Sequence, residues 1–491
     1  MTAAAGGGKP GTGREGMDQV ANQALRRAGG AALAGCGALL PGEALAAGVP
    51  GAELSLAWAL PFAGILLSIA LMPLFAGHVW HRHYGKIGAG WALLVLVPAA
   101  IVFGADRAFH ELAHIMVLEY VPFIALLLAL YTAGGGVRLK GSLVGTPTAN
   151  TVLLAVGTVL ASLMGTTGAA MLLIRPVLRA NAFRRHTTHT FVFFIFLVAN
   201  IGGSLTPVGD PPLYLGFLRG ISFFWPTTHL FGPFLTCAVI LLALYWLLDT
   251  LAWNRERPVA PAEERKEPLS IEGWVNVALV VAIVAVVIGM GYVRLGSVNI
   301  LGQTMETERA VGVVLFLAIT GVSVVFTTRE LREANGFAWG AILEVAKLFA
   351  AIFVCMAPVL AMLRAGPEGA MAGLVALTSD EAGNPIPWVY FWLSGALSSF
   401  LDNAPTYIVF FELAGGDPAF LMGQGALILA AISCGAVFMG ANSYIGNAPN
   451  FMVKAIVEES GVRMPSFFGY CAWAAIVLLP VFVLVTFIFF V

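Results

Sequence analysis

Residues 202–212 read GGSLTPVGDPP, and residues 440–450 read GANSYIGNAPN. Each stretch interrupts an apolar segment, 190–220 or 424–456, that is otherwise long enough to cross a bilayer. Proline removes an amide donor and glycine relaxes the backbone, so neither segment can stay helical throughout. Broken helices at corresponding positions of two halves of a membrane protein are the best sequence indication of a transporter's binding site.

The composition is also that of a membrane protein. Of the 491 residues, 59% are hydrophobic and only 11% are charged, which lies outside the range of soluble proteins. The sequence therefore predicts an all-α polytopic membrane protein, with the lipid bilayer as its partner and with no nucleic acid implied. The expected spans are residues 54–75, 87–104, 114–133, 190–220, 230–249, 272–292, 310–327, 336–363, 424–456 and 466–490.

Two further apolar stretches, 142–174 and 387–412, are each too long for one comfortable span. A polar tetrapeptide interrupts each of them near its middle, GTTG at 165–168 and DNAP at 402–405. Non-helical backbone at membrane depth survives only where protein or a watery cavity satisfies it. Both stretches are therefore predicted to be re-entrant hairpins.

The basic residues predict how the chain is oriented. If the first span runs inward and each hairpin returns to the side that it entered from, most Lys and Arg residues lie in cytoplasmic loops, as the positive-inside rule requires. The outer side then keeps only Arg107, Arg219, Arg294, Arg309 and Arg364.

The chain divides into two halves with the same order of elements. Residues 1–50 are expected to be a signal-peptide-like or disordered leader, 51–250 a first repeat, 251–271 a cytoplasmic linker and 272–491 a second repeat of inverted topology. A shift of 237 positions superimposes both hairpin tips and both breaks. The shift brings Gly203, Thr206, Gly209, Asp210 and Pro212 onto Gly440, Ser443, Gly446, Asn447 and Pro449.

Polar side chains at the four interruptions are the candidate ligands for an ion or substrate. A carboxylate in hydrocarbon is costly unless it is paired, solvated or protonated, so Asp210 and Asp402 are the leading candidates to bind sodium. The other interpretation is that each only caps a broken helix. Neutral oxygens would come from Asn403, Thr166, Thr167, Thr206, Asn442, Ser443 and Asn447.

Charged residues elsewhere in the spans have several interpretations. Glu344 and Lys347 lie three residues apart on one helical face and serve either as a proton relay or as a structural pair. Glu119, His189 and Glu412 lie near span ends, where we expect them to reach the membrane interface.

A rival interpretation rests on residues 110–114, which read HELAH and match the zinc-protease motif HExxH. This would make the chain an intramembrane zinc metalloprotease, with Asp402 as a conceivable third ligand. The motif is expected at the outer mouth between two spans, however, where a wet turn with interfacial histidines also explains it.

With these motifs in place, the chain resembles the ion transporter superfamily, which includes NhaD-like sodium/proton antiporters, arsenite permeases and citrate transporters. The resemblance covers residues from about 54 to the end. It rests on LDNAP at 401–405, GNAPN at 446–450 and the pairing of a hairpin with a broken helix in each half. It implies hairpin tips that meet near the midplane, a transport domain that moves against a scaffold, and a homodimer. Carboxylate-transporting relatives carry Ser-Asn-Thr at both tips, which this chain lacks.

The sequence thus favours a sodium/proton antiporter of the bacterial inner membrane, which moves sodium and protons by alternating access and uses no cofactor. The first alternative is an ion-coupled transporter of citrate or another carboxylate anion, and the second is the protease. In the antiporter interpretation the protein is not an enzyme, and no catalytic residues are expected.

Overall fold

The computed structural model describes residues 50–259, 267–381 and 383–491. Within these residues, ten helices are long and apolar enough to cross a membrane, so the protein is an all-α polytopic membrane protein, as its composition predicts. The expected leader and part of the expected linker lie outside the described residues.

The first half runs from the end of the leader to the linker. Its elements are η1 (Gly51–Glu53), η2 (Leu56–Ala59), α2 (Leu60–Phe75), α3 (Gly77–Phe103), α4 (Ala105–His114), the π-helical η3 (Ile115–Tyr120), α5 (Val121–Gly134), β1 (Arg138–Lys140), α6 (Pro147–Met164), α7 (Thr166–Ala180), α8 (Thr188–Leu197), η4 (Ile201–Leu205), α9 (Pro211–Leu218), α10 (Trp225–His229) and α11 (Phe231–Glu256).

The second half follows the linker. Its elements are β2 (Ser270–Glu272), α12 (Trp274–Tyr292), β3 (Ser297–Ile300), β4 (Gln303–Glu306), α13 (Thr307–Phe326), α14 (Arg329–Ala334), α15 (Trp339–Arg364), η6 (Gly366–Glu368), α16 (Ala372–Leu377), α17 (Pro387–Ser398), α18 (Asn403–Leu413), α19 (Pro418–Met422), α20 (Ala426–Phe438), η7 (Met439–Asn442), α21 (Ala448–Glu459) and α22 (Phe467–Phe489).

Both predicted hairpins and both predicted breaks are present. Helices α6 and α7 pack against each other and are separated at Gly165, while α17 and α18 are separated at 399–402. The segment 190–220 divides into α8, η4 and α9, and the segment 424–456 into α20, η7 and α21. The latter is therefore not one continuous span, because its glycines and proline interrupt the helical hydrogen bonds.

Several boundaries differ from the prediction. Helix α3 begins at Gly77 rather than at 87, because polar residues continue the helix beyond its apolar part. The third span begins at Ala105, since α4, η3 and α5 follow one another without a turn. Helix α7 continues to Ala180 rather than ending at 174, and its last turn carries Arg179.

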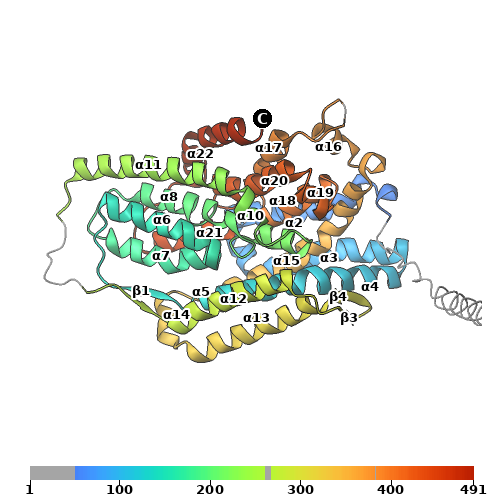
Figure 1. Cartoon of the computed structure of the whole chain (residues 1–491), viewed down its shortest axis with the longest axis horizontal. Helices are drawn as coiled ribbons and strands as arrows, with labels where there is room; N and C mark the ends of the chain where they lie inside the picture. The colour runs from blue at the N-terminus through green and yellow to red at the C-terminus, as the bar shows by residue number, and fades with distance from the viewer. Residues whose placement is uncertain (1–49, 260–266, 382) are drawn as a thin grey trace, which may run out of the picture. The chain divides into compact units, whose positions relative to one another are not determined.

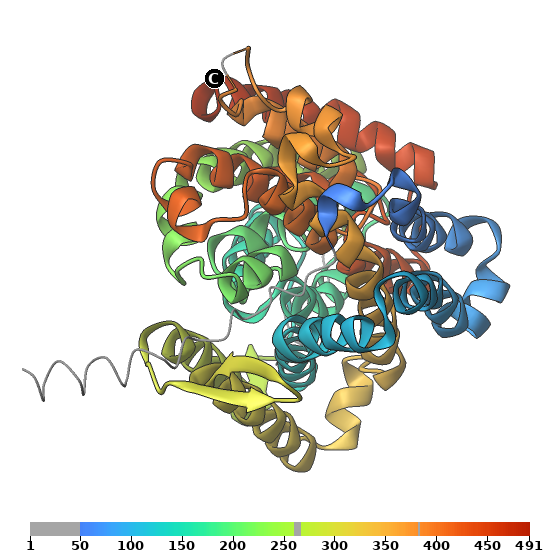
Figure 2. The same cartoon turned by 90° about the vertical axis from the view of Figure 1, so that its right-hand side faces the viewer.

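The core lies around α8. Every residue from Phe191 to Val198 is fully buried, as expected for a helix that is apolar on all sides. On another side, α5 packs against α12 and α13 (Figure 1). Strand β1 pairs with β2 in antiparallel register, and β3 pairs with β4 and packs beside α13 (Figure 2).

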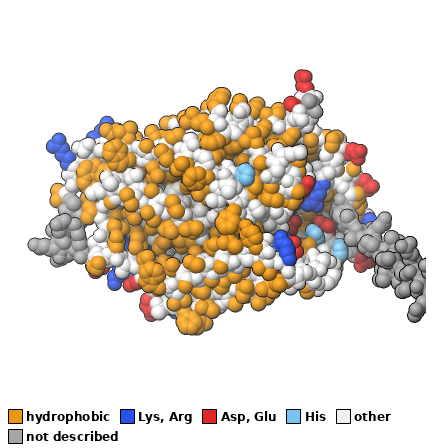
Figure 3. All heavy atoms as spheres, viewed as in Figure 1, with side chains coloured by type: hydrophobic (Ala, Val, Ile, Leu, Met, Phe, Trp, Pro, Cys, Tyr) orange, Lys and Arg blue, Asp and Glu red, His pale blue; other side chains and the backbone are white. Residues whose placement is uncertain are grey.

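The surface fits a bilayer environment. One face is largely covered by hydrophobic side chains, and most charged side chains gather toward its two ends (Figure 3). Large apolar residues are exposed along the long helices, among them Ile101, Val314 and Ile476. A contiguous apolar surface of this kind is stable in lipid and not in water.

Candidate functional site

The two hairpin tips reverse the chain in different ways. Gly165 separates α6 from α7 at φ +80°, a conformation that favours glycine because it has no Cβ. The next residue, Thr166, donates its backbone N–H to the carbonyl of Gly209, 3.0 Å away. At the second tip, the Asp402 carboxylate caps α18 by accepting the backbone N–H of Ala404 at 3.0 Å.

The two broken helices have the same local structure. Asp210 precedes α9 at φ −146°, ψ 143°, and Asn447 precedes α21 at φ −149°, ψ 139°. Proline at the start of both helices fixes a helical φ without needing an amide partner. Each side chain therefore lies at a helix N-terminus, directly after an extended segment.

Equivalent hydrogen bonds join each hairpin to its break. Ser443 Oγ donates to the carbonyl of Ser399 at 2.5 Å, and Thr206 Oγ1 donates in the same way to the carbonyl of Ser162. These two bonds are related by the shift of 237 positions that aligns the sequences of the two halves. Thr206 and Ser443 thus hold the hairpins against the breaks.

The carboxylate of Asp210 joins all four interruptions. Its Oδ1 accepts from Thr166 Oγ1 at 3.1 Å and from Asn447 Nδ2 at 3.5 Å, and its Oδ2 accepts from Asn403 Nδ2. Asp210 is only 2% exposed. Thr166 aligns with Asn403, and Asp210 with Asn447, so two repeat-related pairs meet here.

A second pair of asparagines supports this cluster: Asn450, from the second break, and Asn200, which the sequence did not single out. Asn200 Oδ1 accepts from Asn447 Nδ2 at 3.3 Å, and Asn200 Nδ2 donates to Asn450 Oδ1 at 2.7 Å. Asn450 in turn donates to the carbonyls of Gly440 and Ser443, at 2.8 and 2.9 Å. Both asparagines are fully buried. The sequence feature that could have identified Asn200 is a polar side chain inside an apolar segment.

A cavity of about 170 Å³ lies beside the cluster. Helices α5 and α15 form one wall of it, and both tips and both breaks form the other. Asp210 and Asp402 are its acidic residues, and none of the described residues that line it is Lys, Arg or His. It is lined by Leu126, Leu127, Leu130, Tyr131, Met164–Gly168, Pro207–Pro211, Tyr214, Ala341, Ile342, Val345, Phe349, Asp402, Asn447–Pro449 and Met452.

Four helices begin at this cavity. They are α7, α9, α18 and α21, whose first residues or caps all line it or lie next to a lining residue. A helix N-terminus carries partial positive charge and amides that have no partner within the helix. Converging N-termini can therefore hold negative charge, and Asp210 and Asp402 lie at two of them.

Two buried amide oxygens of the second half have no hydrogen-bond partner among the described residues. They are Asn403 Oδ1 at the hairpin tip and Asn442 Oδ1 in the break. Asn442 donates its Nδ2 to Ser399 Oγ at 2.9 Å, which turns its oxygen away from that hydroxyl. An unpaired buried acceptor is costly, and a cation bound between these elements would satisfy it.

The structure thus brings most of the sequence-predicted site residues together. Thr166, Asn403 and Asn447 each donate a hydrogen bond to Asp210, while Thr167 and Asp402 line the adjacent cavity. Glu344 and Lys347 are not part of this cluster. They face α3, where Glu344 accepts from Trp80 Nε1 at 3.2 Å and the Lys347 ammonium lies 5.6 Å from the Tyr84 ring centroid.

The HELAH motif does not form a metal site in the described part of the chain. It lies in α4, not in a turn. Both of its histidines contact the side chain of Gln303 from β4. His110 Nδ1 lies 3.2 Å from Gln303 Nε2, and His114 Nδ1 lies 3.3 Å from Gln303 Oε1. No group of three or more metal-binding side chains was found among residues 50–259, 267–381 and 383–491.

Glu119, Glu412 and His189 were expected at the membrane interface, but each has a polar partner inside the protein instead. Glu412, whose side chain is 4% exposed, binds Arg219 and Arg364, and Glu119 binds Arg219 at 3.0 Å. His189 Nε2 lies 2.8 Å from Asp249 Oδ1. The expectation was wrong because the partners come from distant parts of the chain and neutralise these groups locally.

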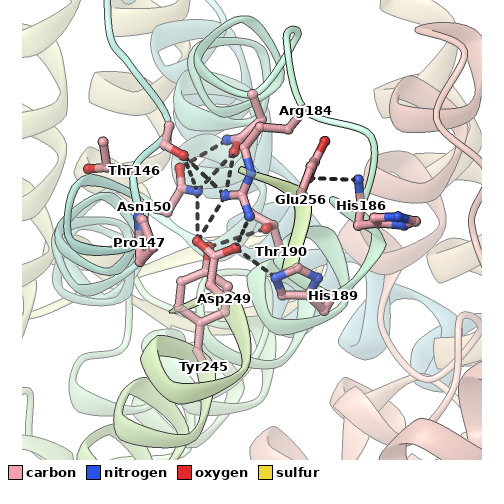
Figure 4. A network of polar contacts seen from close by, with 12 residues as sticks. Thr146, Pro147, Asn150, Arg184, His186, His189, Thr190, Tyr245, Asp249 and Glu256 are labelled. Atoms are coloured by element: carbon pink, nitrogen blue, oxygen red, sulfur yellow. Dashed lines mark hydrogen bonds and ion pairs between the residues drawn. The ribbon is translucent and has the colours of Figure 1, made fainter. Parts of the chain in front are cut away.

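Asp249 is the centre of a buried network at the open end of the first hairpin (Figure 4). Its carboxylate accepts from both terminal nitrogens of Arg184, at 2.6 and 3.0 Å, and from Asn150 Nδ2 and the Tyr245 hydroxyl, each at 3.1 Å. Because Asn150 lies on α6 and Arg184 follows α7, the network anchors both arms of the hairpin to α11.

A comparison with protein families gives the class to which this architecture belongs. A family model described as "Putative citrate transport" (CitMHS_2) matches residues 51–490. A search of curated proteins found no match. The matched region contains both hairpins, both broken helices and every residue of the cavity. The chain therefore belongs to the CitMHS_2 citrate-transport family of polytopic membrane proteins.

Proposed function

We propose that this protein is a secondary transporter of citrate or a related carboxylate, which moves together with cations by alternating access across a bacterial inner membrane. The observation that carries the proposal is the cavity at the meeting point of the four interruptions, where helix N-termini face two carboxylates. The family membership supports a carboxylate anion as the substrate.

The anion would bind at the N-terminus of α7. Unlike α18, this helix has no carboxylate at its N-cap, which is Gly165. Its first-turn amides, at Thr167 and Gly168, have no carbonyl partner one turn earlier in the helix. Thr167 adds a hydroxyl beside the cavity. Helix N-termini with free amides and small residues commonly bind anions.

Cations would accompany the anion, because the cavity wall cannot neutralise it. Citrate carries up to three negative charges, and Asp210 and Asp402 would repel it at a separation of a few ångströms. Among the described residues, the cavity wall has no basic side chain. Cations held by the two carboxylates and by the unpaired oxygens of Asn403 and Asn442 would reverse this repulsion.

The antiporter remains a second candidate function. It is favoured by one observation, that acidic and amide oxygens without basic side chains suit a cation better than an anion. In that case Asp210 and Asp402 would exchange sodium for protons and no carboxylate would enter the cavity.

Calorimetric titration of the purified protein with citrate distinguishes the two. The carboxylate proposal expects citrate binding that strengthens at least roughly tenfold when sodium or magnesium is added, since a 1.4 kcal/mol coupling is tenfold. Binding of sodium with no citrate binding under any cation condition would favour the antiporter and reject the proposal.

A further inference from the structure

A partly buried ion-pair cluster lies away from the cavity, where α9 and α18 end. Glu412 accepts from Arg364 through Nε at 2.8 Å and through Nη2 at 2.9 Å, and also from Arg219 Nη1. Arg219 Nη2 donates to Glu119 at 3.0 Å. The side chains of Glu119, Arg219 and Glu412 are 20%, 12% and 4% exposed, whereas that of Arg364 is 58% exposed, so the cluster lies at the protein surface with Glu412 shielded beneath Arg364.

The same helices connect the cluster to the cavity. Helix α9 begins beside Asp210 and ends before Arg219, and α18 begins beside Asp402 and carries Glu412 in its last turn. At 1.5 Å per residue, these helices place the cluster about 12–15 Å from the cavity. The positive-inside pattern predicts this end to be the outer one.

The four residues come from two groups of elements. Arg219 directly follows α9 and Glu412 lies in α18, and these two helices pack against each other and contribute to the site. Glu119 lies in η3, next to α5, and Arg364 is the last residue of α15. Because α5 and α15 form the opposite wall of the cavity, the bonds Arg219–Glu119 and Arg364–Glu412 cross from one wall to the other.

We propose that Glu119, Arg219, Arg364 and Glu412 form a latch that closes the outer side of the cavity and must open in each transport cycle. This inference rests on the proposed alternating access. The two crossing pairs break when the walls separate, whereas the pair Arg219–Glu412 stays on one wall.

The distribution of charge allows the latch to open without leaving an isolated charge. The α9–α18 wall keeps one arginine and one glutamate, and so does the other wall, where Arg364 interacts electrostatically with Glu119 and Glu111. Removing one partner of a buried ion pair is costly because it leaves the other charge unpaired. An exchange of partners within each wall avoids most of that cost.

The backbone at Glu119 is also unusual. Residues 115–120 form a π-helical segment between α4 and α5. Such segments are rare and are frequent at functional sites, since the wider turn redirects side chains. Here the segment carries the glutamate that binds Arg219.

Cross-linking tests the latch directly. In a background without the five native cysteines, two crossing pairs are replaced, Arg364→Cys with Glu412→Cys and Glu119→Cys with Arg219→Cys. The control, Arg219→Cys with Glu412→Cys, joins residues of one wall and likewise removes one positive and one negative charge. A short, reducible bis-thiosulfonate reagent then links each pair in proteoliposomes.

Compared with the same variant before linking, we expect each crossing link to abolish citrate uptake and reduction to restore it, while the control link changes uptake less than twofold. Uptake that continues through a fully formed crossing link would overturn the latch. So would an equal loss of uptake in the control, because that would show a general effect of cross-linking at this end.

A second measurement does not depend on the substrate. Leu127→Cys, in the cavity wall, is combined with either Glu412→Gln or Glu333→Gln. The new cysteine is then labelled from outside intact cells with a membrane-impermeant maleimide. Glu333 forms an exposed pair with Arg329 and does not line the cavity. Loss of charge-assisted hydrogen bonds should raise the labelling rate roughly tenfold in the Glu412 variant alone.

Equal labelling in the two variants would contradict the latch. If labelling behaves as expected but none of the proteins takes up citrate, the proposed substrate is wrong and the latch still stands.

Discussion

At the residue scale, the account depends on Asp210, whose carboxylate accepts three hydrogen bonds from three other interruptions. Asp210→Asn keeps the side-chain volume but replaces one acceptor oxygen by an amide nitrogen. That N–H donor would face the donor Nδ2 of Asn403 or Asn447, so one hydrogen bond is lost. Charge-assisted bonds contribute about 1.5–3 kcal/mol, so we expect cation-dependent citrate uptake to fall by roughly ten- to a hundredfold. Uptake is measured at several cation concentrations.

The exposed Asp106→Asn is the matched control for this substitution, and it should transport normally. If Asp210→Asn keeps the cation dependence of the wild type, the assignment of Asp210 as a cation ligand fails.

The asparagine pair makes a separate residue-scale prediction. Asn200→Val and Asn450→Leu insert the residues that the other half carries at the aligned positions, Val437 and Leu213. Each removes hydrogen bonds that position Asn447 and leaves buried partners unpaired, at about 1–3 kcal/mol. We expect the cation concentration for half-maximal uptake to rise roughly tenfold.

A role limited to folding would give a different result for these variants. The amount of folded protein would fall, but the remaining protein would keep its cation affinity.

The sequence predicted part of this site at the residue scale. Asp210 and Asn447 stood out because polar residues and proline interrupt apolar segments. Asn200 did not, since it follows a continuous apolar helix and its partner Asn450 is 250 positions away. Glu412 was misinterpreted for the same reason, because local sequence does not show that two arginines approach it.

At the element scale, the first hairpin depends on the backbone of Gly165. A Cβ at this position would have space, with its nearest neighbour 3.5 Å away, but φ is +80°. Gly165→Ala should therefore destabilise the tip through strain of about 1–2 kcal/mol. We expect a lower melting temperature in detergent and slower uptake.

Gly168→Ala is the control for that prediction. Its φ is not positive, and its Cβ would come no closer than 3.6 Å to a neighbour. A melting temperature that drops equally in both variants would contradict the role assigned to the left-handed conformation.

The open end of the same hairpin depends on Asp249. Asp249→Asn would leave the buried guanidinium of Arg184 without its counterion. Breaking a buried pair in this way costs about 3–5 kcal/mol, so thermal unfolding should shift down by several degrees. The control is Glu333→Asn at an exposed ion pair. It should change the unfolding temperature little, since surface pairs contribute less than about 1 kcal/mol.

At the scale of the whole molecule, hydropathy and the Gly/Pro interruptions predicted the helical membrane fold, both hairpins and both breaks. They could not predict how the halves meet, because contacts such as Asn403–Asp210 join positions 193 residues apart. They also favoured an antiporter over a carboxylate transporter. The repulsion argument behind that choice counted the two carboxylates but not the four helix N-termini that converge on them.

The most direct test of the central claim is uptake of radiolabelled citrate into proteoliposomes under imposed sodium, magnesium or proton gradients, with Asp402→Asn alongside. The account predicts that at least one inward cation gradient drives citrate accumulation and that Asp402→Asn weakens this coupling. Cation-driven proton movement without any citrate uptake would contradict it and would identify the protein as an antiporter.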